Sequence, residues 1–164
     1  MKKTLSIALV IVSLVAVFCL SSCSGSNGKL QTIKIGNVEL ACGVEMSKVL
    51  DAFSDYEYEY SESISCAYNG LDKIYDYTNE GFCIYTYPVE DKDFILEIVV
   101  TSEDIKQADG KVYVGMSKDE LIALYGEDYS QDGDCFTYVV KDEQTMYFML
   151  YDDKVIEYGI SIAQ

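Results

Sequence analysis

This chain is rich in carboxylates but lacks His and Arg, the residue types that most often serve as catalytic bases and phosphate ligands. The 164 residues include 28 Asp and Glu, 12 Lys, no His and no Arg, for a formal net charge of −16. Without His, a Ser or Cys nucleophile lacks its usual base. Without Arg, there is no bidentate clamp for phosphates. With so many acids, chance carboxylate pairs are unavoidable. We therefore expect a non-enzyme that needs no cofactor, with an envelope hydrolase as the residual alternative.

The four cysteines that follow Cys23 could form disulfides. They are Cys42, Cys66, Cys83 and Cys135, and outside the cytoplasm four thiols allow three connectivities. A bridge between Cys42 and Cys66 is preferred, because a helix followed by a returning strand would bring both ends together. Free buried thiols are the alternative. No Cys-x-x-Cys spacing and no His support a zinc site, and no metal is expected.

The acidic segment of residues 128–134 superficially resembles the start of a calcium loop. Asp128, Ser130, Asp132 and Gly133 take the first ligand and glycine positions, but position 12 falls on Val139 instead of a bidentate Glu. A solvated hairpin connection is the better interpretation.

Fifteen tyrosines are the oddest feature of the composition. Tyr75, Tyr77, Tyr85 and Tyr87 are expected on neighbouring strands, where they would form a binding face, since tyrosine offers a large amphipathic contact area with few rotors. The alternative is ordinary sheet packing, because tyrosine is also a good strand former.

The N-terminus predicts export and lipid anchoring. Met1-Lys2-Lys3 precedes an apolar run that ends in Leu20-Ser21-Ser22-Cys23, the pattern of a secretory signal. These four residues resemble the bacterial lipobox, which implies cleavage after residue 22 and lipidation of Cys23. Residues 1–22 are then the signal peptide, and residues 23–30 are a lipidated flexible tether. An uncleaved membrane anchor is the alternative, although the apolar run is short for a span.

An internal repeat organises the rest of the chain. A shift of 72 residues aligns the glycines and apolar positions of residues 43–53 with those of residues 115–125. Both segments have the apolar spacing of a helical face, and in the second Ser117 and Glu120 predict a capping box, with Gly126 in the left-handed position after the helix.

Strands are expected after each helix, because the apolar period changes to two. The alternating apolar positions of the second copy are Phe136, Tyr138 and Val140, then Met146, Phe148 and Leu150, then Ile156, Tyr158, Ile160 and Ile162. The last strand of the first copy has Phe94, Leu96, Ile98 and Val100. We therefore expect an α+β fold of two tandem repeats, each a helix plus a three-stranded antiparallel meander, sharing a sheet. Two independent α+β domains are the alternative, although the link between the repeats is short. The first repeat spans residues 31–108 and the second spans residues 109–164.

The segment of residues 114–126, Val-Gly-Met-Ser-Lys-Asp-Glu-Leu-Ile-Ala-Leu-Tyr-Gly, resembles the helix that opens the repeats of two families. These are the BamE/SmpA outer-membrane lipoproteins and the tandem-repeat β-lactamase inhibitor proteins. The resemblance implies protein–protein binding through a sheet face and loops, without catalysis, and carries over no contact residues. Residues 65–77 also resemble a stretch of uncharacterised bacterial lipoproteins, which implies no activity.

Together these features predict a lipid-anchored extracytoplasmic binding or scaffold protein of a bacterial membrane. It would be held by lipid on Cys23 and would engage a protein or envelope component through its sheet face and loops. The strongly acidic balance excludes nucleic acid as a partner. The alternative function is a surface lipoprotein that binds cations or small ligands through its carboxylates.

Overall fold

The computed structural model describes residues 30–141 and 144–162, which form a mostly β structure. Of the described residues, 52% are in strands and 14% are helical. Two sheets are present, one of eight strands and one of three. The strands of the large sheet are β3 (Glu59–Ile64), β4 (Leu71–Tyr77), β5 (Phe82–Val89), β6 (Lys92–Val100), β8 (Ser130–Asp132), β9 (Cys135–Lys141), β10 (Gln144–Tyr151) and β11 (Lys154–Ile162).

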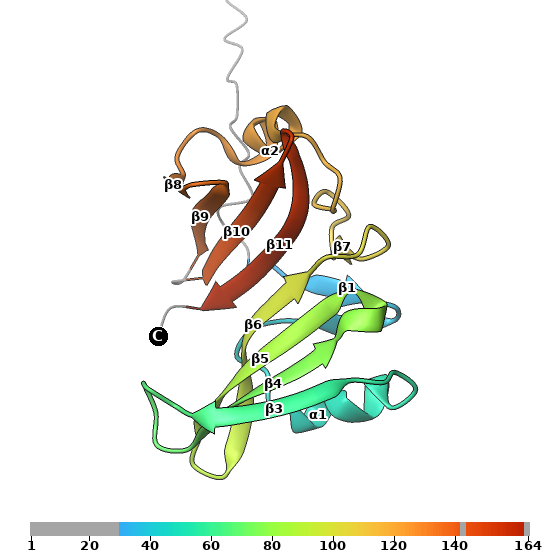
Figure 1. The fold of residues 1–164 in the computed structure, drawn as a ribbon, viewed down its shortest axis with the longest axis vertical. Helices are drawn as coiled ribbons and strands as arrows, with labels where there is room; N and C mark the ends of the chain where they lie inside the picture. Colours follow the sequence, from blue (N-terminus) through green and yellow to red (C-terminus); the bar gives the residue numbers. More distant parts are fainter. Residues whose placement is uncertain (1–29, 142–143, 163–164) are drawn as a thin grey trace, which may run out of the picture.

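The large sheet is antiparallel and has the order β3-β4-β5-β6-β11-β10-β9-β8 (Figure 1). Its two halves, β3 to β6 and β8 to β11, are each a meander of sequential strands. They join where β6 pairs with β11, with Val100 opposite Tyr158 and Ile98 opposite Ile160. All four of these side chains are buried, so the middle of the sheet lies over the centre of the core.

The small sheet contains β1 (Ile33–Ile35), β2 (Val38–Leu40) and β7 (Lys106–Gln107). A buried group of three glutamines attaches it to the large sheet. The backbone N–H of Gln31 donates to the side-chain oxygen of Gln144 at 2.6 Å. The side-chain nitrogen of Gln144 donates back to the backbone carbonyl of Gln31 at 3.0 Å. The Gln107 side chain donates to that of Gln31. Buried amides paired in this way fix the position of one sheet on the other.

The helices cover the same face of the large sheet as the small sheet does. In α2 (Lys118–Tyr125), Leu121 and Tyr125 are buried, and the Tyr125 ring lies 5.7 Å from that of Phe148 on β10. The capping box is confirmed, since the Ser117 hydroxyl accepts from the Glu120 amide and the Glu120 carboxylate accepts from the Ser117 amide. Gly126 ends the helix at φ 87° and ψ −169°. The positive φ suits glycine, but the ψ lies outside the left-handed region expected there.

The prediction of an α+β fold with a helix as a main element of each repeat is wrong. The first helix is only α1 (Ser47–Leu50), continued by a 3-10 turn over Asp51–Phe53, and no side chain caps it. Strands replace the expected helical content, because β3 adds a fourth strand to the first meander and β8 adds a fourth to the second. Three further strands form the separate small sheet.

Two bulges shift which residues enter the core. The β5–β6 register skips Leu96, so Ile95 is buried where the alternating pattern had predicted Phe94 and Leu96. The β10–β11 register likewise skips Ile156, which is 50% exposed while Val155 is buried. An extra residue in one strand reverses the faces of the residues before it. The expected positions Phe136, Met146, Phe148 and Tyr158 are buried.

Candidate functional site: the open face of the large sheet

One face of the large sheet carries the candidate site. Across residues 30–141 and 144–162, α1, α2 and the small sheet all pack against the other face. We call the remaining face the open face. Its side chains alternate with the buried ones along each strand and are mostly half-buried. The central ones are Cys83, Tyr85, Tyr87, Glu97, Val99, Thr145, Tyr147, Met149, Glu157 and Ser161.

Tyr147 lies at the centre of the open face between two carboxylates. Its hydroxyl donates to Glu157 Oε1 at 3.3 Å. Burial, together with the charges of Glu97 and Glu157, raises the pKa of Tyr147, so the phenol stays protonated and acts as a donor. Burial also raises the pKa of Glu97, and the hydrogen bond from the Tyr147 hydroxyl offsets this rise only in part. The result is a partly desolvated acidic centre.

The Tyr147 ring packs on a glycine of the neighbouring strand. A Cβ atom at Gly159 would lie 2.3 Å from the Tyr147 ring, so only glycine leaves room for the ring at this position. Beside this pair, the hydroxyls of Thr145 and Ser161 are hydrogen-bonded at 2.7 Å. These cross-strand contacts hold the centre of the face in one arrangement.

Aromatic rings form one end of the open face. The ring of Tyr87 lies 4.9 Å from that of Tyr68 and 6.0 Å from that of Phe94. Tyr85 follows along β5, between this aromatic group and Cys83. Burial raises the pKa of Tyr85 to about 12, with the nearby Cys83 as the next cause. Burial also raises the pKa of Tyr87, so both β5 tyrosines are neutral and offer amphipathic contact surfaces.

The four tyrosines expected on one binding face do not share a face. Tyr85 and Tyr87 lie on the open face, but Tyr75 and Tyr77 are buried in the core at 7% and 0% exposure. The cause is the register of the β4–β5 hairpin, in which Tyr75 is opposite Ile84 and Tyr77 is opposite Phe82. Opposed residues in an antiparallel pair point to the same side, so the two pairs of tyrosines face opposite ways.

Sequence analysis missed Tyr147, Glu97 and Glu157. The signal that could have found them is the alternation itself. In β10 the buried residues Met146 and Phe148 flank Tyr147, so Tyr147 must face the other side of the sheet.

The structure contains no Cys42–Cys66 disulfide, and all four cysteines among the described residues are free. The Cys42 Sγ donates to the carbonyl of Ile160 at 3.4 Å, whereas Cys66 is exposed in the β3–β4 loop. Burial raises the pKa of Cys42 to about 12 and that of Cys83 to about 11. Within the described part of the chain, no three His, Cys, Asp or Glu side chains are grouped to hold a metal.

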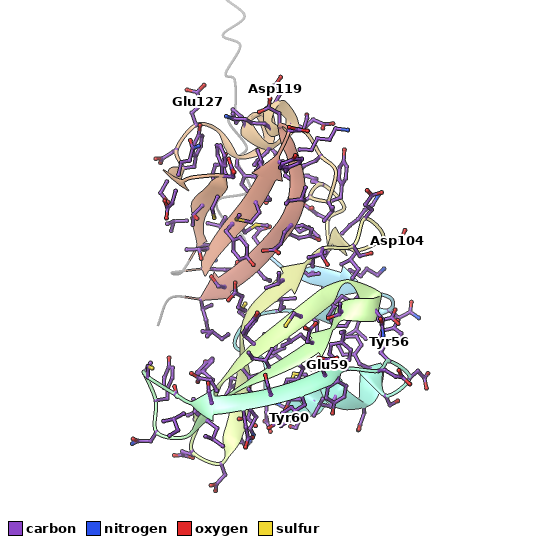
Figure 2. The ribbon with its side chains drawn as sticks, in the orientation of Figure 1. Tyr56, Glu59, Tyr60, Asp104, Asp119 and Glu127 are labelled. Carbon is purple, nitrogen blue, oxygen red and sulfur yellow. The ribbon has the colours of Figure 1, made fainter. Side chains whose placement is uncertain are left out.

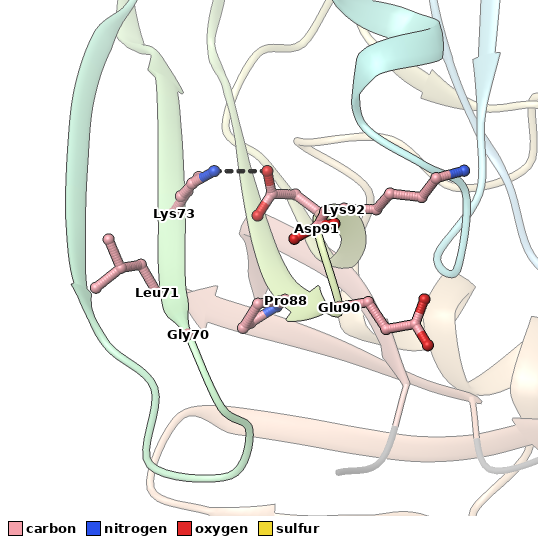
Figure 3. A pocket seen from close by; sticks show the side chains of 8 residues that line it. Gly70, Leu71, Lys73, Pro88, Glu90, Asp91 and Lys92 are labelled. Atoms are coloured by element: carbon pink, nitrogen blue, oxygen red, sulfur yellow. Dashed lines mark hydrogen bonds and ion pairs between the residues drawn. The ribbon is translucent and has the colours of Figure 1, made fainter.

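A hollow of about 200 Å³ lies between the tips of the β3–β4 and β5–β6 hairpins (Figure 3). Lys73 and Lys92 line it, but both are already paired. Lys73 Nζ lies 2.6 Å from Asp93 Oδ2, and Lys92 Nζ lies 3.1 Å from Glu45 Oε2. Because both cations are neutralised, the hollow is a weak candidate for an anionic ligand.

Comparison of the chain with protein-family models, curated proteins and solved structures found no match. The resemblance to BamE/SmpA and to the β-lactamase inhibitor proteins therefore stays a prediction. Cys23 and the signal peptide lie outside the described residues. In the part that the structure describes, no helix has the length and apolar character needed to cross a bilayer.

Proposed function

We propose that this protein is a lipid-anchored extracytoplasmic binding protein without catalytic activity, whose open face engages a protein or an envelope component. The signal and Cys23 of the sequence support the anchor. The open face supports binding, and it is the observation that carries the proposal. A sheet face with half-buried tyrosines and a partly desolvated carboxylate at Glu97 is suited to close contact with another molecule.

The chemistry of the open face defines the partner. Glu97 and Glu157 lie beside Tyr147, so a Lys or Arg side chain entering there would find two carboxylates and an aromatic ring together. Tyr85 and Tyr87 would cover apolar surface around that contact. The partner is therefore basic at its centre of contact and apolar around it.

Photo-crosslinking tests the open face. A benzophenone amino acid is placed at Tyr85 in one variant and at Tyr113 in a control variant, in the cells that produce the protein. Tyr113 is also half-buried, but it contacts Lys106 and α2 on the other side of the molecule. We expect a discrete crosslinked product from position 85 that Glu97→Lys abolishes. Equal products from both positions would contradict the proposal.

Intact-mass measurement tests the anchor. The protein isolated from membranes should begin at Cys23 and carry the mass of a diacylglycerol, and Cys23→Ala should remain uncleaved. Cys19→Ala is the matched control, because it changes a cysteine of the same apolar segment and should leave processing unaltered. An unmodified thiol at Cys23 would refute lipid anchoring and leave the binding face untouched.

A further inference from the structure

The outer edge of the large sheet is a second surface that the proposed function does not use. This edge is β3, whose six residues are all exposed, and among the described strands it pairs only with β4 (Figure 1). Figure 2 labels Glu59 and Tyr60 along it. The strand contains no Pro or Lys, and its pairing with β4 has no bulge. Pro, Lys and bulges commonly keep a free edge from pairing with other chains, and β3 has none of them; its charged residues are Glu59 and Glu62.

The register shows which backbone groups of β3 are free. The Ser65 amide donates to the Gly70 carbonyl at 3.1 Å, and this pair continues the β3–β4 register. Since hydrogen-bonded and non-hydrogen-bonded pairs alternate in an antiparallel ladder, Ser61 and Ser63 bond to β4. Tyr60, Glu62 and Ile64 therefore direct their N–H and C=O groups to the open edge.

Large apolar side chains lie along the same edge. Tyr58 is 45% exposed, Tyr60 is 49% exposed and Ile64 is 82% exposed. The Tyr60 hydroxyl donates to the Glu62 carboxylate at 2.6 Å. An exposed strand with this content is suited to a partner strand that offers apolar contacts to Tyr58 and Ile64 and a polar residue beside the Tyr60–Glu62 pair.

We infer that β3 pairs with β3 of a second copy of this chain, antiparallel, about a two-fold axis at Ser61. This register places Tyr58 opposite Ile64, Glu59 opposite Ser63, and Tyr60 opposite Glu62. Each exposed apolar residue then meets its complement, and no two carboxylates are opposed. A shift that centres the axis on Glu62 would instead oppose two glutamates, which is unfavourable.

Other occupants fit the edge less well. At the far edge of the sheet, β8 is only three residues long and ends at Asp132, so it cannot match the length of β3. A lysine-rich peptide would suit the net charge of −16, but it would leave Ile64 and Tyr58 without apolar contacts. The like charge of two copies weakens the pairing at low salt, and screening relieves that repulsion.

Engineered disulfides test this register directly. Ser61→Cys and Ser63→Cys are compared in full-length protein that also carries Cys66→Ser, at high dilution in detergent. In the inferred dimer residue 61 lies opposite itself in a non-hydrogen-bonded pair, close enough for a disulfide. The two copies of residue 63 are about 13 Å apart along the strands, too far for one.

We expect the Ser61→Cys protein to form disulfide dimers with a yield on the order of tenfold above that of Ser63→Cys. A mixture of Glu59→Cys and Ser63→Cys proteins should form mixed dimers, because these residues are opposed. The yields should rise several-fold between about 0.01 M and about 1 M salt. Equal yields from positions 61 and 63, or a yield that falls with salt, would overturn the inference. The Cys66→Ser protein alone gives the baseline from the remaining thiols.

Discussion

The ring of Tyr147 on β10 occupies the space above Gly159 on β11, where a Cβ atom would lie 2.3 Å from the ring. Gly159 is directly opposite Tyr147 in the β10–β11 register. An aromatic ring over a glycine compensates for the missing side chain in the middle of a sheet. This packing also places the Tyr147 hydroxyl beside Glu157. The glycine at position 159 therefore positions the acidic centre of the open face.

Gly159→Ala should therefore destabilise the protein, even though alanine usually favours a strand over glycine. The added methyl group must displace the Tyr147 ring, at a cost of about 1–3 kcal/mol in the free energy of unfolding. Urea denaturation measures this cost. The double variant Tyr147→Ala with Gly159→Ala removes the clash, so it should be no less stable than Tyr147→Ala alone. Additive losses would show that the ring does not fill this space.

Tyr77→Phe should stabilise the protein. The Tyr77 side chain is fully buried, and its hydroxyl has no hydrogen-bond partner among the described residues. The ring itself stacks on Phe82 at 4.5 Å, and phenylalanine keeps that contact. Removing an unsatisfied hydroxyl is expected to raise the free energy of unfolding by about 1 kcal/mol, measured by urea denaturation.

Tyr138→Phe is the matched comparison, since the Tyr138 hydroxyl donates to the Gly126 carbonyl at 3.1 Å. Losing that bond should lower the free energy of unfolding by about 1 kcal/mol. If both variants shift stability in the same direction, the two hydroxyls do not differ in the way the structure shows.

Ser117→Ala should destabilise α2, because it removes the hydroxyl that accepts from the Glu120 amide. Loss of an N-cap of this kind costs about 1 kcal/mol, seen as a lower urea midpoint. Ser54→Ala is the control, since Ser54 ends a 3-10 turn through its backbone amide alone. A midpoint unchanged by Ser117→Ala would mean that the capping box does not contribute to folding.

Glu97 and Glu120 should give opposite pH dependences. Burial raises the pKa of Glu97, so the folded state holds this proton more tightly than the unfolded state. Stability from Glu97 is then full at acid pH and is lost as pH rises through the raised pKa. Glu97→Gln should therefore be more stable than the parent at neutral pH, and the difference should vanish below about pH 4.

The Ser117 amide and hydroxyl lower the pKa of Glu120. Its stabilisation is present above the ordinary carboxyl pKa and is lost as pH falls. Glu120→Gln should be less stable than the parent at neutral pH, with the gap closing in acid. Thermal unfolding from acid to neutral pH measures both variants, and the same sign for both would contradict these assignments.

Cys66 should be the fastest of the four described thiols to react with an alkylating reagent near pH 8. Cys66 is exposed, whereas Cys135 is only half-buried. Burial raises the pKa of Cys42 to about 12 and that of Cys83 to about 11, which leaves little reactive thiolate at these two residues. Cys66→Ser should abolish the fast phase. Absence of a fast phase in the parent, with a peptide mass showing Cys42 joined to Cys66, would restore the disulfide that the sequence favoured.

Much of the core was predictable from the alternation of apolar residues, and the fold class was not. Phe136, Phe148 and Tyr158 are buried as the period of two predicts. Ile95 and Val155 were missed because bulges at Leu96 and Ile156 change the register. A bulge depends on pairing with the next strand, which a one-dimensional pattern does not contain.

The two helices differ in how well the sequence predicts them. Ser117 and Glu120 predict the start of α2 because a capping box is a local interaction. The first helix has similar apolar spacing but no cap, and it is only four residues long. The candidate site was partly predicted, through Tyr85 and Tyr87. Tyr75 and Tyr77 were assigned to the wrong face because their orientation depends on hairpin register.

The aromatic packing gives the protein an unusual optical property. The chain has no tryptophan, so its ultraviolet emission comes from phenol rings. Those of Tyr75, Tyr77, Tyr125, Tyr138 and Tyr158 are all enclosed in the core. The tyrosine emission of this chain thus reports on both the interior and the surface of the fold, and no indole obscures the signal.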